Sequence, residues 1–240
     1  MTTTDAVRYE VEDGIVTLTM DDPNQSANTM NDTYRASMEA AVDRLAKQIA
    51  NDPDSVTGVI VTSAKKTFFA GGDLKLMTQA TPDDAADLFE NIEAIKATLR
   101  QLETIGRPVV AAINGAALGG GLEIALACHH RIAAEGRYDI GLPEVTLGLL
   151  PGGGGVTRMT RMFGIQDALM QHLLQGQRRK PAQARELGVV DEVVPADQLL
   201  TAAKAWLESV RGDEQAATQP WEREGYRMPG GTPRSPKLAA

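Results

Sequence analysis

Two glycine-rich segments are the places in this 240-residue chain where a ligand could come closest to the backbone. The first spans residues 68–74 (FFAGGDL), and the second spans residues 114–123 (NGAALGGGLE), whose three glycines precede an apolar run. The first N–H groups of a helix lack internal acceptors, and glycine has no β-carbon to keep a ligand away. Residues 119–121 are therefore a candidate site for stabilising an oxyanion, although close helix–strand packing would explain the same glycines.

Two glutamates lie in apolar or glycine-rich surroundings. Glu123 follows the triple glycine and precedes the sequence IALA, and Glu144 lies within IGLPEV. Burial raises the pKa of a carboxyl group toward neutrality, which suits the group for proton transfer. Each glutamate could equally be solvated or salt-bridged, and the sequence alone does not bring the two together in space.

The sequence lacks the motifs of several other common binding and catalytic sites. The two glycine runs, 119–121 and 152–155, both fail the dinucleotide pattern G-x-G-x-x-G, and the chain has neither a Gly-Lys-Ser/Thr phosphate loop nor a Gly-x-Ser-x-Gly elbow. The three histidines, His129, His130 and His172, lack metal-ligand spacing, so no metal site is predicted. The single cysteine, Cys128, ends an apolar run and is predicted to be a core residue.

Composition limits the possible partners. The net charge of −8 and the pI of about 5.0 argue against nucleic acid, which needs a basic surface. Local Lys, Arg and backbone N–H groups could still hold a polyanionic ligand. With one cysteine, no basic and apolar leader, and no apolar run of about 20 residues, the chain is expected to be cytoplasmic, with no membrane span.

The elements that must position these groups alternate between strands and helices, which indicates an α/β class. The Asp13-Gly14 turn predicts a hairpin, Asn31 or Asp32 is a plausible N-cap, and one long helix carries an apolar stripe. The predicted strands are 7–11, 15–20, 56–62, 108–113, 131–134, 139–141 and the extended stretch 189–194. The predicted helices are 33–49, 82–105 (apolar stripe Leu88, Ile92, Ile95, Leu99 and Leu102), 122–128, 182–187 and 196–210.

Taken in order, these segments resemble the crotonase (enoyl-CoA hydratase/isomerase) superfamily. The resemblance covers roughly residues 7–210 and is carried by segments 68–74, 112–123, 140–161 and 180–195. Segments 24–31 and 140–161 and the tail from Pro220 onward resemble more closely the hydratase domain at the N-terminus of multifunctional fatty-acid-oxidation α subunits. In that group a dehydrogenase domain follows.

The resemblance implies a fold and a domain division. The fold would be a crotonase-like spiral of β-β-α units with a helical C-terminal region. Residues 1–195 would form the spiral core and residues 196–212 a C-terminal helix. Residues 213–240, rich in Pro and Gly, would be a weakly structured tail or a remnant linker to a missing dehydrogenase domain.

The resemblance also implies roles for particular residues. The backbone N–H groups of Gly72 and Gly120 would bind a thioester oxygen, and Glu123 and Glu144 match the two catalytic glutamates of hydratases. Many family members have Ala at the position of Gly72, and the backbone N–H donor is kept with glycine there. Further residues expected to contact the substrate or its CoA moiety are Ala70, Gly71, Asp73, Lys75 and Gly119.

The implied reaction is reversible addition of water to a 2-enoyl-CoA, with CoA as part of the substrate and no separate cofactor or metal. Glu144 would be the main proton donor to the α carbon, and Glu123 would be the main water activator. Two alternatives stay open: 3-enoyl-CoA isomerisation, and a truncated, inactive acyl-CoA-binding or assembly module. A homo-oligomer, either trimer or hexamer, is expected, or else packing on a dehydrogenase or thiolase partner.

Overall fold

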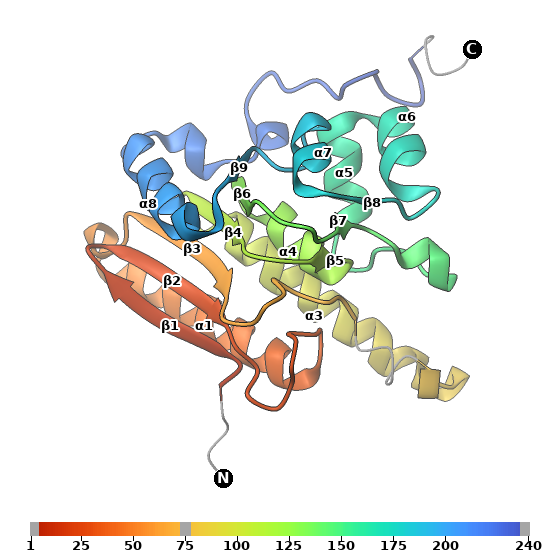
Figure 1. The fold of residues 1–240 in the computed structure, drawn as a ribbon, viewed down its shortest axis with the longest axis horizontal. Coiled ribbons are helices and arrows are strands. Elements are labelled where there is room, and N and C mark those ends of the chain that lie inside the picture. The colour runs from red at the N-terminus through yellow and green to blue at the C-terminus, as the bar shows by residue number, and fades with distance from the viewer. Residues whose placement is uncertain (1–4, 73–77, 236–240) are drawn as a thin grey trace.

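The computed structural model of the protein describes residues 5–72 and 78–235, and it places two β-sheets beneath and between helices (Figure 1). The larger sheet has the strand order β1-β2-β3-β4-β6-β9, and the smaller has the order β5-β7-β8. The strands are β1 Val7–Glu12, β2 Ile15–Met20, β3 Gly58–Ser63, β4 Val109–Ile113, β5 Ala117–Leu118, β6 His130–Ala134, β7 Ile140–Gly141, β8 Arg178–Arg179 and β9 Glu192–Val194.

The helices cover both faces of the larger sheet. The α-helices are α1 Asp32–Asn51, α3 Ala85–Glu103, α4 Gly120–Ala127, α5 Gly155–Phe163, α6 Ile165–Asp167, α7 Pro181–Glu186 and α8 Leu199–Ser209. Shorter helical turns are η1 Pro53–Ser55, η2 Pro82–Asp84, η3 Glu144–Leu147, η4 Ala168–Leu173, η5 Ala196–Gln198, η6 Glu214–Ala217 and η7 Pro220–Glu222. No helix in the described ranges is long and apolar enough to cross a membrane.

The first two strands form the predicted hairpin. Asp13 and Gly14 both have positive φ, 52° and 79°, as a two-residue type I′ turn requires. Strand β1 pairs antiparallel with β2, and β2 then pairs in parallel with β3, which begins the parallel part of the sheet.

Successive side chains of a strand point to opposite faces of the sheet, so the parallel strands contribute to two separate hydrophobic clusters. Val59 and Val61 of β3 face the large cluster that includes α1, α3 and α4, whereas Ile60 faces the smaller cluster beneath α8. Both faces of β3 and β4 are buried, which explains why these strands are almost continuously apolar.

Helix α1 begins where the sequence predicted. The Asn31 side chain caps it by accepting a hydrogen bond from the Tyr34 N–H at 2.8 Å. Its buried residues, including Met38, Val42 and Leu45, recur at spacings of three and four and pack on the larger sheet.

Helix α3 carries the predicted apolar stripe but buries only part of it. The C-terminal members of the stripe, Leu99 and Leu102, are buried. Leu88 and Ile92 are 39% and 40% exposed because the N-terminal half of α3 extends beyond the sheet and borders a cavity instead.

The smaller sheet results from a repeated strand-strand-helix unit. After β4 the chain forms β5 and then α4, and after β6 it forms β7 before reaching η3 and α5. Phe69, which follows β3, makes a parallel bridge to Ala117 of β5, and Ala117 pairs in turn with Ile140 of β7. Each turn of the chain thus adds one segment to each sheet.

Part of the segment after α8 packs against the core. Gln219 is 1% exposed, and its side-chain amide donates to the carbonyl oxygens of Leu126 and Cys128 at 3.3 and 3.2 Å. Trp221 is also buried. The segment therefore satisfies C-terminal carbonyls of α4, which no internal N–H can reach, a long-range contact that its Pro- and Gly-rich composition does not reveal.

Candidate active site

The three segments singled out in the sequence meet around one cavity of about 400 Å³. Gly71, Gly72, Gly119 and Gly120 line it together with Glu123 and Glu144, and Ala70 lines it as well. The structure therefore brings together all of the predicted site residues that it describes. Asp73 and Lys75 lie outside the described residues.

The smaller sheet is what joins the segments. The Phe69 N–H donates to the Ala116 carbonyl at 2.9 Å, and the Leu118 N–H donates to the Phe69 carbonyl at 3.2 Å. The Gly119 N–H then donates to the carbonyl of Gly141 at 2.9 Å. The glycine loops are thus cross-linked to each other and to the segment that leads to Glu144.

Glycine is required at the junction of the two loops. Gly71 and Gly119 have φ of 100° and 54°, which other residues rarely adopt. A β-carbon at Gly119 would lie 2.9 Å from Glu144 Oε1, and one at Gly71 would lie 3.1 Å from the Leu118 carbonyl oxygen. Side chains here would clash with the neighbouring loop or with the Glu144 carboxyl group.

Two amide groups at this junction are available to a ligand. Gly120 is the first residue of α4, and the first hydrogen bond within this turn runs from the Glu123 N–H to the Gly119 carbonyl. Among the described residues, no acceptor is recorded for the N–H of Gly120 or for that of Gly72. Both residues line the cavity, so both amides are candidates to donate to a ligand oxygen.

Glu123 is buried, at 3% exposure, and its carboxyl group is held by backbone amides. The Gly155 N–H, the first of helix α5, donates to Glu123 Oε1 at 2.8 Å. Burial raises the pKa of Glu123, while the amides of Gly153, Gly154 and Gly155 and the charge of Arg158 oppose that rise. The start of α5 also favours a negative charge.

The glycine run at 152–155 is explained by this contact. A β-carbon at Gly153 would lie 2.8 Å from Glu123 Oε2, and one at Gly155 would lie 3.0 Å from Glu123 Oε1. Only residues without side chains let the backbone wrap the carboxyl group this closely. The run was predicted to be a loop, and the structure differs only in starting α5 at Gly155.

A buried ion pair helps to hold the glycine run in place. Arg158 of α5 binds Glu103 of α3 through two contacts, Nε to Oε1 at 2.9 Å and Nη2 to Oε2 at 3.0 Å. Its remaining nitrogen, Nη1, donates to the Gly153 carbonyl at 3.1 Å. Arg158 and Glu103 are 7% and 3% exposed, so the pair fixes the run that holds Glu123.

Glu144 has a different environment. It begins the short turn η3 and is only partly buried, yet burial raises its pKa to about 7, with a smaller contribution from the charge of Glu123. Its Oε2 atom is buried and has no hydrogen-bond partner among the described residues. Both carboxyl groups line the same cavity, and the charge of Glu123 contributes to the raised pKa of Glu144.

Comparison with known proteins agrees with this geometry. The sequence model of the enoyl-CoA hydratase/isomerase family matches residues 10–221. The chain belongs to that family. Among solved structures, it is similar to an enoyl-CoA hydratase from Bacillus anthracis (33% identity, TM-score 0.74, 85% of this chain and 76% of that one). It is also similar to DspI from Pseudomonas aeruginosa (28% identity, TM-score 0.76, 90% and 85% covered). The predicted crotonase fold is thereby confirmed.

Curated relatives of this family member include the fatty acid oxidation complex subunit alpha of Shewanella sp. strain MR-4, which is 42% identical over 195 residues. The match covers 80% of this chain but 26% of that relative. The chain therefore spans about a quarter of the length of the curated relatives that it matches, in line with the predicted resemblance to the N-terminal part of such subunits.

Apolar side chains form part of the cavity wall. They come from α3 and from the segment after Glu144, and they are Leu88, Ile92, Ile95, Leu147, Leu149 and Leu150. Most are substantially exposed, with Leu150 at 79%. An exposed apolar wall beside a polar centre is typical of a site for a ligand that is itself part apolar.

Several residues that shape the site were missed by sequence reasoning. Arg158 and Glu103 are far apart in the chain, and nothing in their local pattern indicates a buried ion pair. Asn28 was also missed, although it anchors the first glycine loop: its carbonyl accepts from the Ala70 N–H at 2.8 Å. By contrast, Cys128 is buried, as predicted. No cluster of three metal-ligating side chains exists within residues 5–72 and 78–235.

Proposed function

We propose that this chain is an enoyl-CoA hydratase that adds water reversibly to a 2-enoyl-CoA. The observation that carries the proposal is the position of Glu123 and Glu144 in one cavity, beside two glycine-loop amides. Water adds poorly to an isolated alkene. Conjugation to a thioester lets negative charge move onto the carbonyl oxygen. The amides can then stabilise that charge while the carboxyl groups transfer protons.

The amides of Gly72 and Gly120 would stabilise the charge that develops on the thioester oxygen. Each lies in a glycine loop fixed by the smaller sheet, so little reorganisation is needed when the charge forms. Loss of one such donor typically costs about 3–4 kcal/mol of barrier. Ala70, Gly71 and Gly119 would line the path of the thioester.

The glutamates would exchange protons with water and with the α carbon. A pair holding one proton can do both, one member accepting a proton from water while the other donates one. Burial raises the pKa of Glu123, and the surrounding amides counter that rise by stabilising the carboxylate that water activation needs. Glu144 has a pKa of about 7 and one oxygen that no residue in the described part of the chain hydrogen-bonds, so it is suited to donate a proton to the α carbon.

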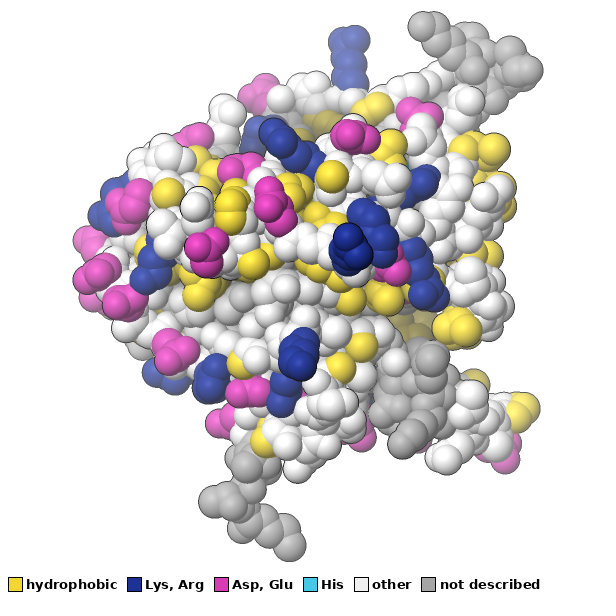
Figure 2. All heavy atoms as spheres, viewed as in Figure 1, with side chains coloured by type: hydrophobic (Ala, Val, Ile, Leu, Met, Phe, Trp, Pro, Cys, Tyr) yellow, Lys and Arg dark blue, Asp and Glu magenta, His cyan; other side chains and the backbone are white. Residues whose placement is uncertain are grey.

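The surface is compatible with an anionic ligand despite the net charge of −8. Figure 2 shows Lys and Arg side chains gathered right of centre, whereas acidic side chains are more frequent toward the left of that face. Arg178, on β8, lies at the cavity. Such cations could meet the phosphates of CoA, and neither a cofactor nor a metal enters the proposed reaction.

The test is a hydration assay of the purified chain with crotonyl-CoA. Loss of the conjugated thioester absorbance together with formation of 3-hydroxybutanoyl-CoA supports the proposal. Conversion of 3-hexenoyl-CoA to the 2-enoyl form without hydration would favour the isomerase alternative instead. Binding of butanoyl-CoA with neither reaction would favour the inactive acyl-CoA-binding module.

The proposed setting is fatty acid oxidation in the cytoplasm, as a homo-oligomer or on a dehydrogenase or thiolase partner. Light scattering of the purified chain separates a trimer or hexamer from a monomer. A monomer would favour the partner-dependent alternative.

A further inference from the structure

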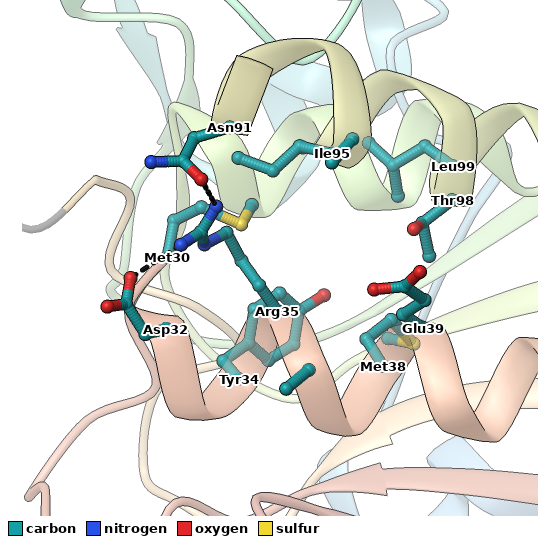
Figure 3. A pocket seen from close by; sticks show the side chains of 12 residues that line it. Met30, Asp32, Tyr34, Arg35, Met38, Glu39, Asn91, Ile95, Thr98 and Leu99 are labelled. Atoms are coloured by element: carbon teal, nitrogen blue, oxygen red, sulfur yellow. Dashed lines mark hydrogen bonds and ion pairs between the residues drawn. The ribbon is translucent and has the colours of Figure 1, made fainter. Parts of the chain in front are cut away.

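A second cavity, of about 380 Å³, lies between α1 and α3 and adjoins the catalytic one (Figure 3). Five residues line both cavities, namely Met30, Asp32, Arg35, Asn91 and Ile95. Each volume falls within the range of about 300–1,000 Å³ that is typical of small-molecule sites. These shared side chains lie at the boundary between the two spaces, and they are called the partition below.

Arg35 closes the partition. Its side chain leaves α1 and donates from Nη1 to Asn91 Oδ1 on α3 at 2.5 Å, and its Nη2 lies 2.6 Å from Asp32 Oδ1 (Figure 3). The guanidinium group therefore spans the gap between the two helices.

The ion pair between Arg35 and Asp32 adds little to the stability of the partition. The Asp32 side chain is 82% exposed, and an ion pair with so exposed a partner contributes little to stability. Arg35 has a long, flexible side chain whose charged end could move into water while its methylenes stay against apolar neighbours. Met30, also in the partition, is unbranched and adaptable.

The walls of the second cavity are largely apolar on the inner side. Met38 and Leu99 are 2% exposed each, and Ile95 continues from one cavity into the other. Tyr34 lines the space, and its hydroxyl is buried and has no hydrogen-bond partner among the described residues. Glu39 and Thr98 provide the remaining polar atoms, and Glu39 is exposed, so the far end of the cavity reaches solvent (Figure 3).

We propose that the second cavity binds the distal part of a medium- or long-chain acyl group, and that Arg35 limits the chain length. This inference rests on the proposed function and specifies its substrate class. Leu88, Ile92 and Ile95 form an apolar path along α3 from the catalytic cavity toward the partition. A chain that passes Arg35 gains about fourfold in affinity for each methylene that it buries.

Blocking the cavity tests the proposal. Ala94 and Ala97 are both exposed residues of α3, but only Ala94 lines the second cavity. Ala94→Phe is therefore designed to occupy that cavity, and Ala97→Phe is the matched control. Ala94→Phe is expected to lower the ratio of kcat/KM for 2-dodecenoyl-CoA to that for crotonyl-CoA by at least about tenfold, the equivalent of two lost methylenes. Ala97→Phe should leave the ratio unchanged.

Removing the Arg35 side chain from the partition should increase the preference for long substrates. Arg35→Ala is expected to raise the ratio of kcat/KM for 2-hexadecenoyl-CoA to that for crotonyl-CoA. Arg44→Ala is the control, because Arg44 lies on α1 but packs over Tyr9, away from the cavity. Equal effects of Ala94→Phe on short and long substrates, or an unchanged chain-length profile in Arg35→Ala, would overturn the proposal.

Direct binding separates this inference from the proposed function. If the wild-type chain hydrates no enoyl-CoA, the proposed function fails. Titration of wild type and Ala94→Phe with dodecanoyl-CoA and butanoyl-CoA still examines the cavity. Selective loss of dodecanoyl-CoA affinity in Ala94→Phe would support the second cavity, and equal affinities in both proteins would reject it.

Discussion

Glu123 and Glu144 occupy the same cavity but are held in opposite ways. Glu123 is on a helix, is almost fully buried, and receives backbone amides from the glycine run, which Arg158 and Glu103 hold in place. Glu144 is in a short turn, is partly exposed, and has one oxygen that no described residue hydrogen-bonds. Amide donors stabilise a carboxylate, whereas burial without donors stabilises the protonated acid.

The difference between the two environments explains how two identical side chains can have different roles in one reaction. We expect the single proton of the pair to reside mainly on Glu144 before water adds, because the amides of the glycine run counter the effect of burial on Glu123. The pair titrates as a unit, so the assignment concerns which state predominates.

The largest expected effect is that of removing the proton donor. Glu144→Gln should lower turnover of crotonyl-CoA by at least about 10²-fold, because an amide cannot deliver the proton. Butanoyl-CoA affinity should change little, since the glycine-loop amides are retained. Stopped-flow absorbance gives the rate and calorimetry the affinity. Near-normal turnover would remove Glu144 from the reaction.

The pH dependence sharpens the comparison. The pKa of Glu144 is raised to about 7, so above that pH the pair loses the proton that the reaction needs. We expect kcat/KM to fall with rising pH through about 7, by about tenfold per unit on the alkaline side. Measurement from about pH 5 to about pH 9 checks this. A profile that stays flat to the alkaline end would contradict a protonated Glu144 in the free enzyme.

A smaller effect is expected from disturbing the amides around Glu123. Gly153→Ala places a β-carbon 2.8 Å from Glu123 Oε2, which must shift the carboxyl group or the glycine run and should lower kcat by about tenfold. In Gly152→Ala the new carbon meets Ile92 at 3.7 Å, an ordinary contact, so the loss should stay within about threefold. Equal losses in both variants would show that the run needs flexibility rather than room for Glu123.

Local rules allowed a good part of the fold to be predicted from the sequence. The Asp13-Gly14 turn, the Asn31 cap and the apolar strands follow from backbone preferences and periodicity within a few residues. Helix α4 begins two residues earlier than predicted, because the glycines themselves form its first turn.

The candidate site was predictable in its residue types but not in its arrangement. Glycines at 71, 72, 119 and 120 and the two glutamates were identified from their surroundings and from the family resemblance. Their convergence depends on pairing between Phe69, Ala117 and Ile140, which are distant in the chain. No local pattern encodes such pairing.

The sequence by itself therefore determined which groups can do chemistry: amides without side chains in front of them, and two carboxyl groups in apolar surroundings. Only the tertiary structure decided which carboxyl group receives donors, that Arg158 binds Glu103, and that half of α3 borders a cavity rather than the core. The physical reason is that hydrogen bonding, desolvation and burial depend on neighbours brought together by folding, whereas residue type and periodicity are properties of the chain alone.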